Sequence, residues 1–145
     1  MSLIPARLLQ RVRRRAHGCC EYCRSQERIV GEKFTIDHVF PRAKGGSDDP
    51  SNLALCCYVC NPLKGDRTEA PDPQTGQVVP LFSPRQRRWS AHFEWSDDGL
   101  VIVGKTPIGR ATVETLRLNR SSLLIARQTW VRWGVHPPIS HRRSS

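Results

Sequence analysis

Two pairs of cysteines have the spacing of a metal site. Cys20 and Cys23 are separated by two residues, and Cys57 and Cys60 repeat that spacing later in the chain. Two intervening residues allow both thiolates of one turn to reach the same ion, and two such turns complete a tetrahedron around zinc. Because four thiolates leave no position for water, the sequence predicts a structural Zn²⁺ site and not a hydrolytic one.

Two further cysteines, Cys19 and Cys56, directly precede these pairs. Pairs formed by Cys19 with Cys23 and by Cys56 with Cys60 would have three intervening residues, which fits a tight turn less well. We therefore interpret Cys19 and Cys56 as thiols outside the metal site. The alternative is that all the cysteines are buried free thiols.

Four polar residues nearby suit the hydrolysis of a phosphodiester: Asp37, His38, Asn52 and Asn61. The Asp37 carboxylate and the Asn61 side-chain carbonyl offer oxygens, which a hard cation such as Mg²⁺ or Mn²⁺ prefers. A neutral imidazole at His38 can take a proton from water, and Asn52 is a candidate to hold that ring in place. The ion would stabilise charge on the phosphate and on the leaving oxygen. Taken singly, each residue has a simpler interpretation, since asparagine commonly occupies turns and helix caps.

The charge of the chain favours a nucleic-acid partner. Its 145 residues carry a formal net charge of +10, and the isoelectric point is about 10.1. Arginine supplies most of the basic residues, and its planar fork suits phosphate oxygens. A basic surface of this strength is typical of nucleic-acid-binding proteins, although the base composition of a genome also enriches arginine.

Helical spacing predicts an amphipathic helix from Pro5 to His17. Apolar residues recur at four-residue steps along one face, which is typical of a buried stripe: Ile4, Leu8, Val12 and Ala16. Another face carries four arginines without a compensating acid, and these are candidate phosphate contacts: Arg7, Arg11, Arg14 and Arg15. The alternative for this face is an ordinary solvated surface.

Short segments surround the polar residues. Residues 28–39 predict two extended pieces separated by Gly31-Glu32, and Tyr58 to Asp66 predicts a short helix. The stretch from Thr68 to Pro80 is expected to be a linker, because its prolines exclude a long helix. Val78 to Phe82 is expected to be an exposed strand.

The C-terminal half predicts a hairpin and two helices. Two short strands flank a turn at residues 96–99, where glycine favours a hairpin. One helix is expected from Thr106 to Leu118, and a second, capped by Asn119, is expected to end at Trp133. Three arginines before the hairpin are candidate contacts for a DNA backbone: Arg85, Arg87 and Arg88.

Together these residues resemble the HNH endonuclease family, in the subgroup whose motif is bracketed by two CxxC turns. The resemblance covers residues 16–68, and it rests on Cys20, Cys23, Asp37-His38, Pro41, Gly45-Gly46, Asn52-Leu53, Cys57, Cys60-Asn61 and Lys64. It implies an α+β fold with a ββα-metal core, in which His38 lies on the first strand and Asn61 on the helix. Residues 78–133 resemble C-terminal extensions of some bacterial HNH proteins.

The resemblance also implies a role for each residue. His38 would be the general base, and Asn52 would orient it. Asp37 and Asn61 would hold the catalytic ion, and Lys64 would contact phosphate. Asn61 stands where many members have histidine, which favours Mg²⁺ or Mn²⁺ over a softer metal.

The expected function is metal-dependent hydrolysis of DNA phosphodiester bonds, by nicking or by double-strand cleavage, leaving 5′-phosphate and 3′-hydroxyl ends. The alternative is a non-catalytic zinc-knuckle module that binds DNA or RNA. Residues 1–68 are expected to form the nuclease core with its N-terminal helix, and residues 69–145 an extension packed on that core. The expected partner is duplex or nicked DNA rather than RNA, bound by a monomer or a transient homodimer.

The sequence predicts a cytoplasmic protein without a membrane association. No apolar run approaches the ~20 residues that cross a bilayer. At the N-terminus the positive charges follow the apolar residues, which is the reverse of a secretory signal. In a reducing compartment, cysteines of this spacing are more often metal ligands than disulfides.

Overall fold

The computed structural model of the protein describes residues 4–138. This part of the chain divides into two compact units. The first unit runs to Thr68 and also contains Ser83–Gln86, whereas the second contains Glu69–Phe82 and the chain from Arg87 onward. Separate domains at 1–68 and 69–145 stay a prediction, and residues 1–3 and 139–145 lie outside the described part of the chain.

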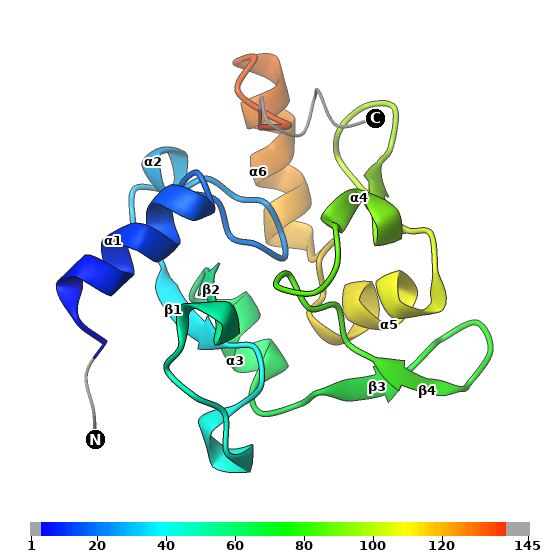
Figure 1. Ribbon diagram of the computed structural model, residues 1–145. Coiled ribbons are helices and arrows are strands. Elements are labelled where there is room, and N and C mark those ends of the chain that lie inside the picture. The colour runs from blue at the N-terminus through cyan, green and yellow to red at the C-terminus, as the bar shows by residue number, and fades with distance from the viewer. Residues whose placement is uncertain (1–3, 139–145) are drawn as a thin grey trace. The chain divides into compact units, whose positions relative to one another are not determined.

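The first unit is built on an antiparallel hairpin followed by a helix (Figure 1). Its strands and longer helices are α1 (Ala6–Arg15), α2 (Glu27–Val30), β1 (Thr35–His38), β2 (Leu53–Cys56) and α3 (Cys60–Lys64). In the hairpin, Thr35 pairs with Cys56 and His38 with Leu53. Every residue of β2 is buried, as its apolar sequence requires. The predicted α+β class and the ββα order are therefore confirmed.

Helix α1 contacts β2, and two residues of the predicted apolar stripe are buried. Val12 and Ala16 are buried. Arg13 also attaches the helix to the rest of the unit. Arg13 donates to the Phe34 carbonyl at 3.0 Å and to the Glu27 carboxylate at 3.1 Å. Helix α1 is therefore held by polar contacts as well as by its apolar face.

The segment before β1 differs from its prediction. Glu27–Val30 forms one helical turn, not an extended piece. Gly31 ends this turn with a φ of 86°, which glycine adopts at little cost. The Glu27 carboxylate accepts from the Phe34 backbone amide at 2.6 Å, so tertiary contacts stabilise the turn against its β-branched composition.

The second unit contains two hairpins and three helices among its described residues. These elements are β3 (Glu69–Pro71), β4 (Val78–Pro80), α4 (Trp89–His92), β5 (Phe93–Trp95), β6 (Ile102–Gly104), α5 (Pro107–Thr115) and α6 (Ser121–Arg132). The stretch predicted to be a linker is in fact the hairpin β3–β4. In its turn, the Asp72 carboxylate accepts from the Gln74 amide at 3.1 Å and the Thr75 hydroxyl at 2.9 Å. It also accepts two hydrogen bonds from Arg110. The second hairpin and the last two helices follow the prediction.

Aromatic rings form part of the core of the second unit. Phe82 and Phe93 meet edge to face with ring centroids 5.1 Å apart, and Trp89 lies 5.0 Å from Phe93. Asn119 does not cap α6, which begins after Arg120. Its amide instead bonds both backbone groups of Ile102 at 2.8 Å. None of the helices in residues 4–138 is both long and apolar enough to cross a membrane.

Candidate active site and metal centre

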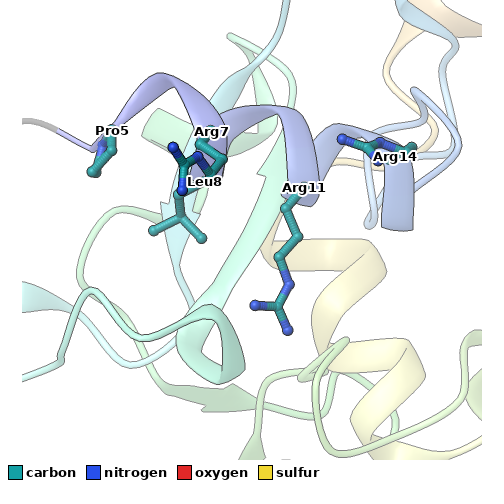
Figure 2. A pocket seen from close by; sticks show the side chains of 5 residues that line it. All are labelled: Pro5, Arg7, Leu8, Arg11 and Arg14. Atoms are coloured by element: carbon teal, nitrogen blue, oxygen red, sulfur yellow. The ribbon is translucent and has the colours of Figure 1, made fainter.

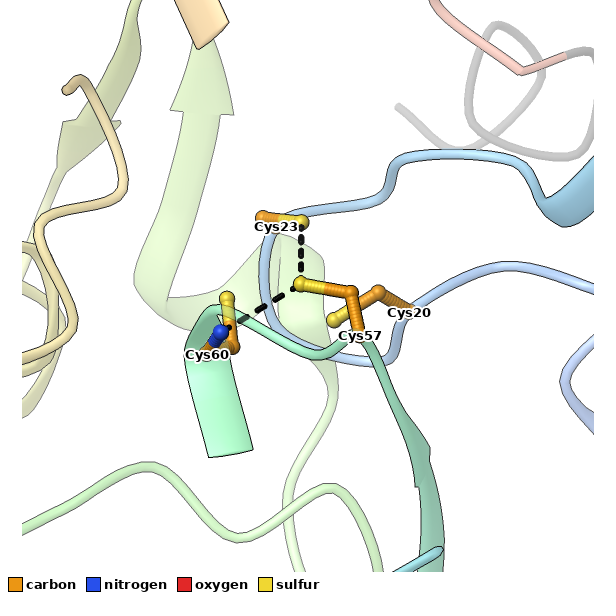
Figure 3. Close-up of side chains that lie close together, drawn as sticks. All are labelled: Cys20, Cys23, Cys57 and Cys60. Atoms are coloured by element: carbon orange, nitrogen blue, oxygen red, sulfur yellow. Dashed lines mark hydrogen bonds between the residues drawn. The ribbon is translucent and has the colours of Figure 1, made fainter. Parts of the chain in front are cut away.

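The four cysteines of the two CxxC turns converge in the structure (Figure 3). The Sγ atoms of Cys20, Cys23, Cys57 and Cys60 all lie within 4.8 Å of one another, and all four residues are buried. The Sγ atoms of Cys23 and Cys57 are 3.8 Å apart. Four sulfurs bound to one zinc ion lie roughly 3.8 Å from each other, given a Zn–S distance of about 2.3 Å. The cluster is therefore positioned to bind a metal ion, and its geometry fits Zn²⁺.

Backbone pairing brings the two turns together. The Glu21 amide donates to the Leu55 carbonyl at 2.9 Å. The Leu55 amide donates in return to the Glu21 carboxylate at 2.8 Å. Because Leu55 lies on β2, the first CxxC turn is attached to the strand that leads into the second.

Cys19 and Cys56 lie outside this four-residue cluster, although both are buried. All six cysteines have free thiols. Burial raises the pKa of the Cys19 thiol above its ordinary value of 9.0, which favours a protonated thiol there. The interpretation of the Cys20/Cys23 and Cys57/Cys60 pairs as the metal ligands agrees with this arrangement.

Asp37 lies on β1 with only 3% of its side chain exposed. The Tyr22 hydroxyl donates to its Oδ2 at 2.7 Å, and the Lys64 ammonium donates to its Oδ1 at 3.1 Å. Burial and the adjacent Asp37 carboxylate raise the pKa of Tyr22 well above its ordinary value of 10.0. The phenol therefore stays protonated and acts as a donor to Asp37.

The structure places Lys64 differently from the expectation of a phosphate contact. Its side chain is 2% exposed. Besides Asp37, its ammonium donates to the carbonyls of His38 and Val39, both at 3.2 Å. All three donor positions of the ammonium point into the protein, so Lys64 fixes the end of β1 from within.

Asn61 lies on α3, and its Nδ2 atom is 3.5 Å from the carbonyl of Ile36, the residue before Asp37. The helix therefore presents Asn61 to β1, as the ββα arrangement implies. The oxygens of Asp37 and Asn61 suit a hard cation, and Mg²⁺ commonly takes one or two protein ligands and completes its shell with water and phosphate. A carboxylate has about four lone-pair positions, of which Tyr22 and Lys64 engage two. The donor set fits a divalent ion, while the positive charge of Lys64 opposes its binding.

His38 ends β1 with 16% of its side chain exposed. Its Nε2 atom is 2.8 Å from Oδ1 of Asp48. The same carboxylate oxygen accepts from Arg42, at 3.0 Å from Nε and 2.8 Å from Nη2. Sequence reasoning missed Asp48 and Arg42, because an aspartate after Gly45-Gly46 is also an ordinary turn residue.

Within residues 4–138, no hydrogen bond joins Asn52 to the His38 imidazole. The Asn52 amide donates to the carbonyls of Phe40 at 3.0 Å and Ser47 at 2.8 Å, and its Oδ1 accepts from the Phe40 amide at 2.8 Å. Asn52 therefore closes the loop between the two strands. None of these three bonds reaches the His38 imidazole, and the expected role of Asn52 in orienting His38 stays a prediction.

The arginines of α1 fall into two groups. Arg15 donates to the carbonyls of Pro50 at 3.0 Å and Leu53 at 2.6 Å. Like Arg13, it therefore attaches the helix to the rest of the unit. Three other arginines at helical spacing are exposed: Arg7, Arg11 and Arg14. Together with Pro5 and Leu8 they line a surface hollow of about 680 Å³ (Figure 2).

The arginines predicted after the linker also differ from one another. The Arg85 guanidinium forms an ion pair with Glu21, the residue after Cys20, and its side chain is only 14% exposed. It therefore supports the first CxxC turn and is not a surface contact. Arg87 and Arg88, in the second unit, are exposed.

Comparison with known protein families identifies one domain of the chain. Residues 20–67 match the family model described as HNH endonuclease. The match contains both CxxC turns together with β1, β2 and α3. The chain therefore contains an HNH endonuclease domain at these residues. Searches of curated proteins and of solved structures found no match.

Proposed function

We propose that the protein is a metal-dependent HNH endonuclease that hydrolyses phosphodiester bonds in DNA. The observation that carries this proposal is the arrangement of three side chains on the ββα unit. His38 stands at the end of β1, Asp37 precedes it, and Asn61 faces the same strand from α3. A module that only binds nucleic acid needs none of these groups.

In the proposed reaction, the His38 imidazole removes a proton from water, and the resulting hydroxide attacks phosphorus. The bond from phosphorus to the 3′ oxygen breaks, which leaves a 5′-phosphate and a 3′-hydroxyl. A proton from solvent neutralises the leaving oxygen. Asp37 and Asn61 would hold Mg²⁺ or Mn²⁺, which stabilises negative charge on the phosphate and the leaving oxygen.

The four-cysteine cluster has a structural role in this proposal. Four thiolates complete a tetrahedral Zn²⁺ shell and leave no position for water. The ion would join the turn before α2 to the turn before α3. It thereby fixes the start of the helix that carries Asn61, without a part in the chemistry.

The exposed stripe of Arg7, Arg11 and Arg14 is the proposed contact for the DNA backbone. The three residues recur at helical spacing, and none of them has an acidic partner among the ion pairs of residues 4–138. An arginine guanidinium can donate two parallel hydrogen bonds to the oxygens of a phosphate. A metal site built from cysteines suits a compartment in which thiols stay reduced, and we therefore expect a cytoplasmic protein.

One observation favours the second candidate, a zinc-knuckle module that binds nucleic acid without cutting it. Lys64 compensates the charge of Asp37 within the protein, so Asp37 has a structural partner even without an ion. In that case the basic surface would still bind DNA. The two candidates differ in whether a divalent ion binds at Asp37 and in whether His38 acts as a base.

Supercoiled plasmid incubated with Mg²⁺, Mn²⁺, Co²⁺ or Ni²⁺ separates the two candidates. We expect the wild type to cut, and His38→Ala to lose cleavage by about 10²–10⁴-fold, the usual contribution of a general base. Zinc content, folding and DNA affinity of His38→Ala should stay near those of the wild type. A wild type that cuts nothing with any of these ions, while it binds DNA as well as His38→Ala does, identifies the protein as a binding module.

A further inference from the structure

The loop that joins β1 to β2 is closed tightly around the end of β1. The side chain of Asn52 bonds the amide and carbonyl of Phe40 and the carbonyl of Ser47. Gly46 lies against the same place, since a Cβ atom built on it would lie 1.7 Å from the Phe40 carbonyl oxygen. Only glycine permits this close approach of the loop to the Phe40 carbonyl.

This closed loop determines where Asp48 lies. Asp48 follows Ser47, whose carbonyl is held by Asn52 at 2.8 Å. Its Oδ1 atom is then 2.8 Å from Nε2 of His38. The contact joins two residues ten positions apart, and it exists because the loop returns to the strand end.

Arg42 holds the Asp48 carboxylate in that orientation. Its Nε and Nη2 atoms lie 3.0 Å and 2.8 Å from Oδ1, the oxygen that also faces His38. Hydrogen bonds between charged groups are stronger than neutral ones. Two such bonds from one planar guanidinium oppose rotation of the carboxylate away from the imidazole.

We propose that Asp48 is the positioning residue for His38, with Arg42 and Asn52 acting through it. This inference rests on the proposed nuclease function. The Asp48 carboxylate accepts a hydrogen bond from the protonated Nε2, so Nδ1 is the unprotonated nitrogen of the neutral ring. Nδ1 is then the atom that takes the proton from water. A carboxylate that fixes the tautomer and direction of a histidine base is a recurring arrangement in hydrolases.

If the role of Asp48 were purely structural, its substitution would lower stability and activity together. Asp48 and Arg42 are each 38% exposed, and exposed ion pairs contribute little to stability. Loss of the Asp48 charge should therefore leave the fold intact. A large loss of activity without a loss of stability identifies a positioning role.

The first experiment compares Asp48→Asn with Asp66→Asn, an exposed aspartate of the same unit. Both substitutions remove one negative charge and keep the shape of the side chain. We expect kcat of Asp48→Asn to fall about 10–100-fold, as for other residues that orient a histidine in a site, while KM and the thermal midpoint change little. Asp48→Glu, which keeps the carboxylate, should recover part of the activity. Asp66→Asn should cut at the wild-type rate.

The second experiment observes the imidazole directly and needs no cleavage. The ¹⁵N NMR shifts of a neutral histidine distinguish its protonated from its unprotonated nitrogen, and the His38 signals are those absent from His38→Gln. We expect the Nε2-protonated form to dominate in the wild type and the Nδ1-protonated form to increase in Asp48→Asn. If the wild type shows this preference but cuts no DNA, the positioning by Asp48 is right and the nuclease function is wrong.

A double substitution provides the decisive comparison. In a His38→Ala background, Asp48→Asn should cause no further loss of the residual activity, because Asp48 acts through the imidazole. The proposal is overturned if Asp48→Asn lowers activity in the His38→Ala background by the same factor as in the wild type. So does wild-type cleavage by Asp48→Asn, or a His38 tautomer that the substitution leaves unchanged.

Discussion

The ammonium of Lys64 lies 3.1 Å from Oδ1 of Asp37, and both side chains are almost completely buried. This ion pair joins α3 to β1 at the point where the catalytic ion is proposed to bind. It compensates the carboxylate charge while adding a positive charge beside the ion. Loss of either partner should therefore destabilise the ββα unit, and the charge of Lys64 should weaken the binding of a divalent cation at Asp37.

Replacement of Lys64 by methionine should destabilise the protein by about 3–5 kcal/mol, the usual result of removing one partner of a buried ion pair. Among residues 4–138, the Tyr22 hydroxyl would remain as the donor to the Asp37 carboxylate. Urea unfolding measures the change, with Lys44→Met as the control because Lys44 is exposed. Mg²⁺ should raise the thermal midpoint of Lys64→Met more than that of the wild type. Equal shifts would show that Lys64 does not oppose the ion.

Loss of a metal ligand should unfold the first unit. Structural zinc contributes apparent binding free energies of roughly 10–16 kcal/mol in small modules, so Cys20→Ser and Cys57→Ser should be poorly folded and contain little zinc. Cys19→Ser and Cys56→Ser should keep one zinc per chain, because neither thiol belongs to the four-cysteine cluster. Elemental analysis with circular dichroism measures both properties. Folded, active protein without zinc contradicts the assignment.

The exposed stripe of α1 should determine the salt dependence of DNA binding. Removal of one phosphate contact on duplex DNA lowers the slope of log K against log salt by about 0.9. Substitution of Arg7, Arg11 and Arg14 by alanine should therefore reduce the slope by up to roughly 2.7. Arg15→Gln is the contrasting variant, because its donors bind backbone carbonyls. Arg15→Gln should lower stability and leave the slope unchanged. If the slope is also unchanged in the triple variant, the exposed face of α1 is an ordinary solvated surface.

Residue spacing predicted the parts of the site that are local in sequence. A CxxC turn forms within four residues, and the positions of His38 on a strand and of Asn61 on a helix follow from short-range patterns. Contacts between distant segments were not predictable in this way. Lys64 could turn outward to phosphate or inward to Asp37, and only the packing of α3 on β1 decides between them.

The same limit applies to Asp48 and to the turn at Glu27. Asp48 resembles any aspartate of a glycine-rich loop until the loop closes on His38. Glu27 begins a helical turn because its carboxylate bonds Arg13 and the Phe34 amide, which local composition does not contain. Both errors arise where a tertiary hydrogen bond decides a local conformation.

Arg85 should affect stability and not DNA affinity. Its guanidinium pairs with Glu21, which also bonds the Leu55 amide beside the metal centre. Burial raises the pKa of the Glu21 carboxyl above its ordinary value of 4.5, so removal of the arginine leaves an acid that is costly to ionise. Arg85→Gln should lose up to about 3–5 kcal/mol in urea unfolding, and Arg88→Gln, at an exposed position, should lose little. If Arg85→Gln instead reduces the salt dependence of DNA binding and leaves stability unchanged, Arg85 is a DNA contact.

The proposed mechanism uses one histidine base, His38, per chain, so one chain should cut one strand in each encounter. A time course on supercoiled plasmid should show nicked circles first and linear product later. Mixtures of wild type with an excess of His38→Ala test whether a transient dimer makes double-strand breaks. In a dimer mechanism, linear product falls with the square of the wild-type fraction, while nicking falls in proportion to it. Linear product that appears without a nicked precursor, from protein shown to be monomeric on DNA, contradicts the assignment of one cut per chain.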